Sequence, residues 1–219
     1  MTNKGISQAV IGRLPRYYRY LGDLQKEGVE RISSQELSWI MNVTASQIRQ
    51  DFNNFGGFGQ QGYGYNIAYL REEIGKILGL NHQHNMILIG SGHLGSALIN
   101  YMKFRTRGFL FKAAFDSNPD LIGTTIGGIE IHAVTELESY LRENSIDIAV
   151  LTLPREAALK VTEILARSNI RAIWNFAHLD LDVPDTITVE NVHLSDSLMK
   201  LSYNIHRNSV STDKMDKDD

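Results

Sequence analysis

One short segment limits the fold of this chain more than any other. The apolar run Met86–Ile89 is suited to a buried strand. Six residues that fit the pattern G-x-G-x-x-G follow it directly: Gly90, Ser91, Gly92, His93, Leu94 and Gly95. Between a strand and a helix, this pattern is typical of the phosphate-binding turn of a Rossmann domain. Gly90 permits the tight turn, Gly92 lets a pyrophosphate approach the backbone, and Gly95 lets the helix pack closely on the strand.

An acidic residue stands where such a domain needs one. Asp116 comes 21 residues after Gly95, at the end of the apolar run Ala113–Phe115. A carboxylate at this point can accept hydrogen bonds from both ribose hydroxyls of NAD(H) and would repel the 2′-phosphate of NADP(H). Each feature alone also fits a helix cap or a turn at the end of a sheet. Together, the strand, the glycines and the acid predict a site for NADH and NAD+.

Beyond the glycines, apolar strands alternate with amphipathic helices. Strands are expected at 110–115, 146–151, 172–176 and 187–192. Helices are expected at 94–104, with one face made of Leu94, Ala97, Leu98 and Tyr101, and at 155–167. Thr135 and Glu138 are expected to cap another helix, before the strand 146–151. Strands separated by helices predict a doubly wound parallel sheet, so residues 86–193 are assigned to a Rossmann domain.

The end of the chain combines a helix with a polar segment. Residues 194–207 follow the last strand and place Leu198, Leu201 and Ile205 on one side of a helix. Because the sheet is already complete, we expect this helix to form an interface between subunits. Residues 208–219 are polar, and we predict that they are disordered.

The first third of the sequence predicts short helices. The first has apolar residues at helical spacing from Leu14 to Leu24, ends at Gly28, and either bends at Pro15 or begins there. Two capping boxes, at 33–36 and 44–47, then open two further helices. Two capped helices joined by a tight turn indicate a helix-turn-helix, although many bundles that bind no DNA share it.

The limits of these two helices can also be predicted. The second capped helix runs through Ile48 and Phe52, and the first stops near Asn42, a residue type that tolerates the left-handed conformation. The side chains that the first should bury are Leu37, Met41 and either Trp39 or Ile40.

Glycines interleaved with aromatic residues follow at 53–65. They suit a short β-hairpin that approaches another backbone closely, and behind a helix-turn-helix such a hairpin is a wing. A helix from about 66 to 78 completes a domain of residues 1–80, with these side chains facing inward: Tyr69, Leu70, Ile74, Ile77 and Leu78. The polar segment 81–85 is the expected linker. Its two histidines fit exposed linker residues better than metal ligands, so no metal is predicted.

Charge and composition are compatible with DNA binding inside a cell. The net charge of −3 argues weakly against a nucleic-acid partner, but residues 1–80 carry nine Lys/Arg against seven Asp/Glu, a balance of +2 that leaves −5 for the rest. The basic stretch 1–20 can contact phosphates or can be a solvated helix face. The chain has no cysteine, no signal peptide and no apolar run long enough to span a membrane, so we expect a soluble cytoplasmic protein.

Catalytic chemistry is missing from the sequence. A dehydrogenase needs a proton donor or acceptor at the substrate carbon, and none of the seven histidines stands in a recognisable catalytic pairing. The Rossmann part is also too short to leave a substrate domain. A cofactor site without a substrate site predicts a sensor and not an enzyme.

The chain resembles the Rex family of bacterial redox-sensing repressors over nearly its whole length. The segments that carry the resemblance are 13–15, 17–21, 47–52, 55–56, 62–65, 92–98, 115–116, 151–154 and 175–177. The resemblance implies a winged helix-turn-helix domain, a Rossmann domain and a terminal helix swapped between subunits. It also implies a homodimer that binds an inverted-repeat operator in double-stranded DNA when NADH is scarce and leaves it when NADH binds.

The resemblance also assigns roles to residues. The candidate DNA contacts are Arg13, Arg16, Thr44, Ser46, Gln47, Arg49 and Gln50 on helices and Tyr63 and Gly64 in the wing. Besides the glycine turn and Asp116, the residues expected around the cofactor are Thr152, Pro154, Asn175 and Phe176. Many relatives have a basic residue in place of Gln50, so the DNA contacts can differ here.

A switch is implied between the two domains. In similar proteins, an arginine and a tyrosine at the positions of Arg19 and Tyr101 are linked to an acidic residue near the last strand. Here His193 takes that place, with Asp196 nearby, which leaves the details of the switch open. Tyr101 can also be a plain core tyrosine.

Two other functions fit parts of the sequence. One is a small NAD-dependent reductase whose first helices only dimerise it. The other is a nucleotide- or CoA-binding Rossmann module of a larger complex. Hydride transfer to a small substrate would favour the first, and a lack of DNA affinity would favour either over a repressor.

Overall fold

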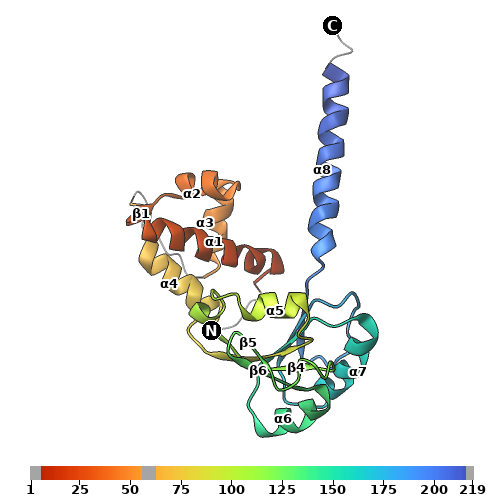
Figure 1. The fold of residues 1–219 in the computed structure, drawn as a ribbon. Helices are drawn as coiled ribbons and strands as arrows, with labels where there is room; N and C mark the ends of the chain where they lie inside the picture. Colours follow the sequence, from red (N-terminus) through yellow and green to blue (C-terminus); the bar gives the residue numbers. More distant parts are fainter. Residues whose placement is uncertain (1–5, 56–62, 216–219) are drawn as a thin grey trace. The chain divides into compact units, whose positions relative to one another are not determined.

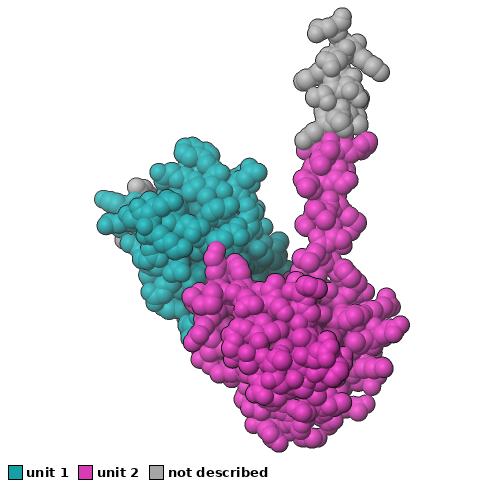
Figure 2. All heavy atoms as spheres, viewed as in Figure 1, with its two compact units in different colours: residues 1–82 teal, residues 83–219 magenta. Residues whose placement is uncertain are grey.

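The computed structural model describes residues 6–55 and 63–215, with side chains as far as Arg207 in the last helix. Within it, the chain forms two compact units, unit 1 (residues 1–82) and unit 2 (residues 83–219), shown in Figure 2. The division falls inside the segment 81–85.

Unit 1 consists of helices and one small antiparallel sheet. Its helices are α1 (Gln8–Lys26), α2 (Ser34–Met41), α3 (Ala45–Asn53) and α4 (Ile67–Ile77), and its strands are β1 (Arg31–Ile32) and β2 (Tyr65–Asn66) (Figure 1). The fully or almost fully buried side chains of its core come from all four helices and from β1: Leu14, Tyr17, Leu21, Ile32, Leu37, Met41, Ile48, Phe52, Ile67, Leu70 and Ile74. A helix-turn-helix, α2 and α3, therefore packs on α1 and α4.

Helix α1 is longer than the sequence predicts. It begins at Gln8 and continues through Pro15, so of the two alternatives at this proline, the one that starts the helix there is wrong. Leu14, Tyr17 and Leu21 lie on one face and are fully buried, which holds the helix in place despite the missing N–H group of the proline. Gly28 follows the helix end with φ of +79°, as expected for a C-terminal glycine.

The capping box of α2 forms as predicted. Ser33 Oγ accepts a hydrogen bond from the Glu36 N–H at 3.1 Å, and Glu36 accepts one from the Ser33 N–H at 2.8 Å. The helix ends at Asn42 in the left-handed conformation, with φ of 52°. Neither Trp39, 72% exposed, nor Ile40, 38% exposed, is buried. That expectation was wrong because Leu37 and Met41, four residues apart, already fill the inward face of this two-turn helix.

The second capping box is only half formed. Thr44 caps α3 by accepting a hydrogen bond from the Gln47 N–H at 3.1 Å. The Gln47 side chain does not return to the cap, because it donates to Asp51 inside the same helix at 2.8 Å. Helix α3 still begins and ends close to the predicted limits, with Ile48 and Phe52 buried.

The predicted wing can be followed at its ends only, since residues 56–62 lie outside the described part of the chain. Strand β2 pairs with β1 in the register Arg31↔Asn66 and Ile32↔Tyr65. Strand β1 was not predicted from the sequence. Gly64 has φ of +69°, and a Cβ there would lie 2.8 Å from the Ile32 carbonyl oxygen. The close approach of two backbones therefore does require glycine at this position.

Helix α4 buries fewer residues than expected. Ile67, Leu70 and Ile74 are fully buried, but Tyr69 is 51% exposed and Ile77 is 37% exposed. Ile67, Leu70 and Ile74 form one row at spacings of three and four residues, and Tyr69 lies outside this row. Ile77 continues the row but is the last residue of the helix.

Unit 2 is built on a seven-stranded sheet. Its strands are β3 (His84–Ile89), β4 (Phe109–Asp116), β5 (Thr125–Ile126), β6 (Ile129–Ala133), β7 (Ile148–Leu151), β8 (Ala172–Asn175) and β9 (Thr188–Asn191). The order is β5-β6-β4-β3-β7-β8-β9, parallel throughout except for the β5–β6 hairpin. Its helical segments are α5 (His93–Ile99), η1 (Arg105–Arg107), η2 (Val134–Glu136), α6 (Leu137–Glu143), α7 (Arg155–Ala166) and α8 (Leu194–Met215). The predicted doubly wound parallel sheet is thus present.

The two faces of this sheet are covered unequally. Ile87 and Ile89 point to the face covered by α6 and α7, where a large apolar cluster forms. Met86 and Leu88 point to the other face, where the short helix α5 contributes only partly buried residues. Residues 176–187, which connect β8 to β9, contain no helix. The second face is therefore partly open over β7, β8 and β9, with a cavity of about 390 Å³.

Several predicted limits in unit 2 were wrong. Helix α5 ends at Ile99 and not at 104, so Tyr101 lies beyond it and is 46% exposed. Leu94, near the start of the helix, is 36% exposed. Its C-terminal end is met by the β5–β6 turn, since a Cβ on Gly127 would lie 3.0 Å from the side chains of Ile99 and Asn100. Thr135 lies within η2 and caps nothing, because α6 begins at Leu137.

The ends of unit 2 also differ from expectation. His84, assigned to the linker, already belongs to β3. Helix α8 continues to Met215, so residues 208–215 are helical and not disordered, while 216–219 lie outside the described residues. Over residues 6–55 and 63–215, the structure contains no helix that is both long enough and apolar enough to cross a membrane.

Candidate functional sites

The glycine turn after β3 shows why each glycine is needed. Gly90 has φ of +100°, and a Cβ there would lie 2.7 Å from the Thr152 carbonyl oxygen. A Cβ on Gly95 would collide with the Gly90 carbonyl oxygen and lie 2.9 Å from Thr152 Oγ1. A Cβ on Gly92, by contrast, would have no atom within 4 Å. Two glycines therefore pack against the protein, and the third faces open space at the start of α5.

Asp116 lies directly beside this turn. Because β3 and β4 are parallel neighbours, their C-terminal ends meet at the same edge of the sheet. Asp116 Oδ2 accepts a hydrogen bond from the Ser91 N–H at 2.5 Å, and Oδ1 accepts one from the Asn118 N–H at 2.9 Å. The carboxylate is thus held at the turn, at the position where an acid can bind the ribose of a dinucleotide.

The hydroxyl of Ser91 is unusual within the described part of the chain. The residue is only 3% exposed, and its Oγ has no hydrogen-bond partner there. A buried hydroxyl without a partner is costly. A ligand oxygen over the glycine turn would satisfy it. The open space beside Gly92 and this hydroxyl both fit a bound phosphate or ribose.

The turn after β7 is bonded to the glycine turn. Thr152 Oγ1 donates to the Gly90 carbonyl oxygen at 2.6 Å, so the side chain holds the two turns together. Pro154 follows as the exposed N-cap residue of α7. Of these two expected cofactor contacts, Thr152 supports the glycine turn and Pro154 lies at the surface of the same edge.

Asn175 turns inward and not toward open space. The side chain is fully buried. Its Nδ2 donates to the Leu179 carbonyl oxygen at 2.9 Å and to Asn191 Oδ1 at 2.8 Å, and its Oδ1 accepts from the Ala177 N–H at 3.0 Å. Asn175 therefore shapes the turn after β8, which also contains the half-buried Phe176.

The three residues expected to form a switch have different surroundings. Arg19 on α1 is exposed and lies over the ring of Tyr20 at 5.2 Å. His193, just before α8, stacks on His178 with ring centroids 6.0 Å apart. Tyr101 is 46% exposed, so its interpretation as a core residue is wrong.

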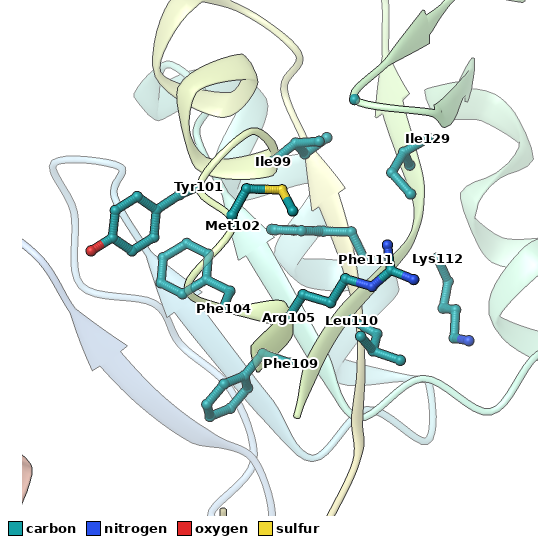
Figure 3. Close-up of a pocket in the computed structure, with 11 residues that line it drawn as sticks. Ile99, Tyr101, Met102, Phe104, Arg105, Phe109, Leu110, Phe111, Lys112 and Ile129 are labelled. Carbon is teal, nitrogen blue, oxygen red and sulfur yellow. The ribbon is translucent and has the colours of Figure 1, made fainter. Parts of the chain in front are cut away.

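Tyr101 borders a cavity of about 290 Å³ in unit 2. Its ring packs edge-on against Phe104 at 4.8 Å, and Phe104 packs in the same way against Trp174 at 5.5 Å. Figure 3 shows the Tyr101 hydroxyl pointing away from the other labelled side chains, with Arg105 and Lys112 on the far side of the aromatic group. The hydroxyl is thus free to meet a group outside this cavity.

In unit 1, one face of α3 is polar and exposed. Its exposed residues include Ser46, Arg49 and Gln50, which repeat at spacings of three and four residues. Arg49 Nη1 donates to Ser34 Oγ at 2.9 Å, and Thr44 lies at the exposed start of the helix. Tyr63, 72% exposed, stands beside Gly64 at the foot of the predicted wing. These residues form a surface that an approaching duplex can reach.

Three of the expected DNA contacts have hydrogen-bond partners inside unit 1. Arg13 donates from Nε and Nη2 to the two oxygens of Asp51, both at 2.7 Å. Gln47 donates to the same carboxylate. Arg16 donates from Nη2 to the Met41 carbonyl oxygen at 2.9 Å. Their assignment as DNA contacts rested on charge and position, and each of the three also has a partner inside unit 1.

Asp51 is a buried charged residue that the sequence reasoning did not single out. Burial alone would raise the pKa of its carboxyl, but hydrogen bonds from Arg13, Gln47 and Tyr17 outweigh this effect and hold the pKa below its ordinary value. The carboxylate therefore stays charged at neutral pH. The one sequence signal was an acid on the inward side of α3, next to Phe52, facing a basic first helix.

No cluster of three or more His, Cys, Asp or Glu residues that could hold a metal ion occurs in the described residues.

Family models match both units. One, described as a putative DNA-binding protein N-terminus, matches residues 5–53, and another, described as a CoA binding domain, matches residues 81–179. A helix-turn-helix unit joined to a unit with a dinucleotide-type turn defines the class of ligand-responsive DNA-binding regulators.

Curated relatives narrow this class. The redox-sensing transcriptional repressor Rex of Clostridioides difficile (strain 630) is 55% identical over 201 residues, which cover 92% of this chain and 96% of the relative. Rex of Clostridium botulinum (strain Hall) is 55% identical over 204 residues, 93% of this chain and 97% of the relative. The chain belongs to the Rex family of redox-sensing transcriptional repressors.

Solved structures agree with this assignment. The crystal structure of RSP in complex with β-NAD+ and operator DNA is 51% identical with a TM-score of 0.89, and covers 96% of this chain and 97% of its own. The crystal structure of RSP in complex with β-NADH is 48% identical with a TM-score of 0.88, and covers 95% of this chain and 98% of its own. RSP is itself described as a Rex-family repressor.

Proposed function

We propose that this chain is a redox-sensing repressor that occupies an inverted-repeat operator when NADH is scarce and leaves it when NADH binds. One observation carries the proposal: a complete dinucleotide-type turn and an exposed polar helix of a helix-turn-helix occur in one chain, in separate compact units. The similarity to repressor structures with NAD+, NADH and operator DNA supports both ligands.

The cofactor is held, on this proposal, by the glycine turn and the groups around it. Asp116 receives the ribose hydroxyls, and the Ser91 hydroxyl donates to an oxygen of the bound dinucleotide. The remaining contacts come from the turn and its neighbours: Gly90, Gly92, His93, Leu94, Gly95, Thr152, Pro154, Asn175 and Phe176. Asn175 contributes by shaping the turn after β8, since its amide is fully engaged. Bound NADH supplies a signal here and is not consumed.

Asp116 is expected to make the protein prefer NADH to NADPH. The 2′-phosphate of NADPH would place a second negative charge beside a carboxylate already held by the Ser91 N–H, and two like charges in a partly desolvated site are costly. Asp116→Ala should therefore narrow the difference in affinity, measured by calorimetric titration with both cofactors. The matched control is Asp120→Ala, which removes an acid from the same loop. Equal affinities in the parent would show that the ribose assignment is wrong.

DNA is bound, on this proposal, by the exposed side of unit 1. The residues assigned to this surface are Thr44, Ser46, Arg49 and Gln50 on the helix-turn-helix and Tyr63 and Gly64 at the wing. Arg49 can contact a phosphate or guanine, and a bidentate contact to guanine contributes about 1–3 kcal/mol of base discrimination. Arg13, Arg16 and Gln47 are left out because they have partners inside unit 1.

A homodimer is also part of the proposal. Helix α8 presents Leu198, Leu201 and Ile205 at 55–67% exposure, although the three form one apolar stripe. The sheet of unit 2 is open on one face, where Met86, Ile148 and Trp174 line an apolar cavity. Both surfaces lack a cover within the described chain, and a second copy with its swapped α8 would bury them. In that dimer, Arg19, Tyr101 and His193 are the proposed switch residues.

The proposed location is the cytoplasm, and the proposed activity is binding without turnover. The relatives are named as repressors, which supports a protein that senses NADH and does not oxidise it. The reductase alternative requires NADH to be consumed when small carbonyl substrates are added. CoA, named in the description of the matching family model, is a suitable competitor in the cofactor titrations.

The central test is reciprocal antagonism between NADH and operator DNA. Each ligand must prefer a different arrangement of the dimer, so each should weaken the other by the same factor, on the order of 1–3 kcal/mol of coupling. Fluorescence titrations of NADH with and without operator duplex, and of duplex with and without NADH, measure both factors, and NAD+ serves as the control. Simultaneous, independent binding would contradict the proposal. Tyr101→Phe should bind both ligands and respond less to NADH; an unchanged response would assign that tyrosine to packing alone.

A further inference from the structure

The carboxylate of Asp51 is the acceptor of four hydrogen bonds inside unit 1. The side chain is fully buried on α3, beside Phe52. Arg13 donates twice, from Nε and Nη2 at 2.7 Å, and the Tyr17 hydroxyl donates at 2.8 Å. The Gln47 amide supplies the fourth bond at 2.8 Å. This cluster, the Asp51 cluster below, joins α1 to the recognition helix α3.

Holding two helices together does not require a charged cluster. Removing a charge from water is costly, and apolar residues of the same volume often stabilise a core equally well. The ion pair instead fixes the orientation of the Arg13 and Asp51 side chains relative to each other. The guanidinium of Arg13 offers two parallel N–H groups in one plane, and both meet the Asp51 carboxylate. Such a contact resists rotation of α3 about its axis as well as separation from α1.

Two adjacent rows of side chains determine the rotation of α3. Ile48 and Phe52, four residues apart, form an apolar row in the core. Gln47 and Asp51, also four apart, form the polar row that belongs to the Asp51 cluster. The opposite face is exposed and carries the residues proposed above to meet DNA: Ser46, Arg49 and Gln50. A helix of nine residues held by the apolar row alone could roll, and rolling would move every one of these side chains.

Helix α1 also holds the other helix of the helix-turn-helix. Arg16, one turn after Arg13, donates to the carbonyl oxygen of Met41, the last residue of α2. The two arginines thus connect α1 to α2 and α3 separately. Both have partners inside the unit, although their charge alone suggested contacts with phosphates.

We propose that Arg13 and Asp51 are positioning residues for operator recognition: their pairing sets the angle at which α3 presents its exposed face, and neither residue contacts DNA. This inference rests on the proposed function, the binding of operator DNA. On this inference, a buried ion pair contributes to the discrimination of the protein between operator and non-operator DNA.

The direction in which one substitution changes operator affinity distinguishes a positioning role of Arg13 from a phosphate contact. Asp51→Asn removes a negative charge and releases Arg13. If Arg13 were a phosphate contact, the variant would bind DNA more tightly. If the pair positions α3, operator affinity should fall about tenfold, the size of one lost base contact, while affinity for non-operator DNA is kept. The matched control is Asp23→Asn, which removes an exposed acid from α1 and should not weaken operator binding.

The less disruptive variant is Arg13→Lys, which keeps the charge and loses the two-pronged contact. It should also lower operator affinity severalfold. The slope of the logarithm of the DNA-binding constant against the logarithm of the salt concentration should stay the same, because no phosphate contact is lost. A fall of the slope by about one unit would identify Arg13 as a phosphate contact and overturn the proposal. Full operator affinity in Arg13→Lys or in Asp51→Asn would overturn it as well.

A third variant distinguishes a loss of DNA selectivity from a loss of folding. The triple substitution Arg13→Met, Tyr17→Phe and Asp51→Leu replaces three of the four members of the Asp51 cluster with apolar side chains of similar size. It should keep the melting temperature and NADH binding, because the half-buried Gln47 amide can turn to water. Its ratio of operator to non-operator affinity should still fall at least tenfold, comparable to one mismatched base pair. All titrations use the full chain, a duplex selected by the parent protein from a random pool, and a scrambled duplex. A parent that selects no duplex would refute the proposed function; a parent that does, with a triple variant of equal selectivity, refutes only this inference.

Discussion

Gly95→Ala is expected to abolish measurable NADH binding and to lower the melting temperature of unit 2. A methyl group at this position would collide with the Gly90 carbonyl oxygen and lie 2.9 Å from Leu88 Cδ2 and Thr152 Oγ1. Because one of these atoms is backbone, the glycine turn or α5 must shift. Overpacking of this kind costs roughly 1–3 kcal/mol, which corresponds to a fall of about 2–12 °C in a chain of this size.

Gly92→Ala separates loss of the ligand site from loss of stability. No atom lies within 4 Å of a Cβ at Gly92, so the variant should melt at the same temperature as the parent. It should still lose NADH affinity, about tenfold or more, if the pyrophosphate packs against this part of the backbone. Gly12→Ala on α1 is the matched control, because its Cβ also meets open space and lies in unit 1.

Thermal denaturation and NADH titration of the three glycine variants distinguish the possibilities. A Gly95→Ala variant with parental stability and affinity would show that the turn is looser than its contacts indicate. A Gly92→Ala variant with parental affinity would place the pyrophosphate elsewhere. Only a loss of affinity in both variants, with a loss of stability confined to Gly95→Ala, agrees with the geometry.

The central strands of the sheet could be predicted because they are apolar runs that are largely buried. The run Met86–Ile89 has no polar residue, and such a run between turn signals has few other interpretations. Strand β5 was missed because it has two residues and carries little periodic signal. Strand β6, with five residues, was missed although its sequence alternates between apolar and polar residues. Strand β1 has two residues as well, and it exists only because β2 pairs with it. Short strands depend on tertiary contacts that the local sequence does not contain.

Exposure on the helices was harder to predict than their positions. Trp39 and Tyr69 are large and partly apolar, yet both lie more than half exposed. Hydrophobicity indicates which residues could be buried, whereas the number of rows that a partner helix can cover decides which ones are. In α5 the same reasoning failed at Tyr101, since the helix ends before reaching it.

The two candidate sites differed in how far the sequence could predict them. The glycine turn and Asp116 are adjacent for reasons of chain topology, so spacing alone located them. The DNA-binding side depends on which polar groups find partners inside unit 1. Arg13 and Arg49 look equivalent in the sequence, but the first is bonded to a buried carboxylate and the second lies on the exposed face. Only the packing of α1 against α3 distinguishes them.

Deletion of α8 is expected to convert the dimer to monomers or aggregates. A chain that stops at Leu194 loses Leu198, Leu201 and Ile205, which are all more than half exposed in one copy. Burying each of them against a second copy would contribute on the order of 1 kcal/mol, and the two swapped helices of a dimer double that sum. The deletion would also expose whatever surface of the partner α8 covers, which favours aggregation.

Point variants make this expectation more specific. Leu198→Glu combined with Leu201→Glu keeps the helix but places charges in the apolar stripe, so it should also dissociate the dimer. Lys200→Glu is the matched control, because helical spacing puts residue 200 on the side opposite Leu198. Light scattering at several protein concentrations measures the mass of each species. NADH titration in parallel tests whether unit 2 is still folded. A truncated chain that remains a soluble dimer would contradict the exchange of α8 and would place the interface on the open face of the sheet alone.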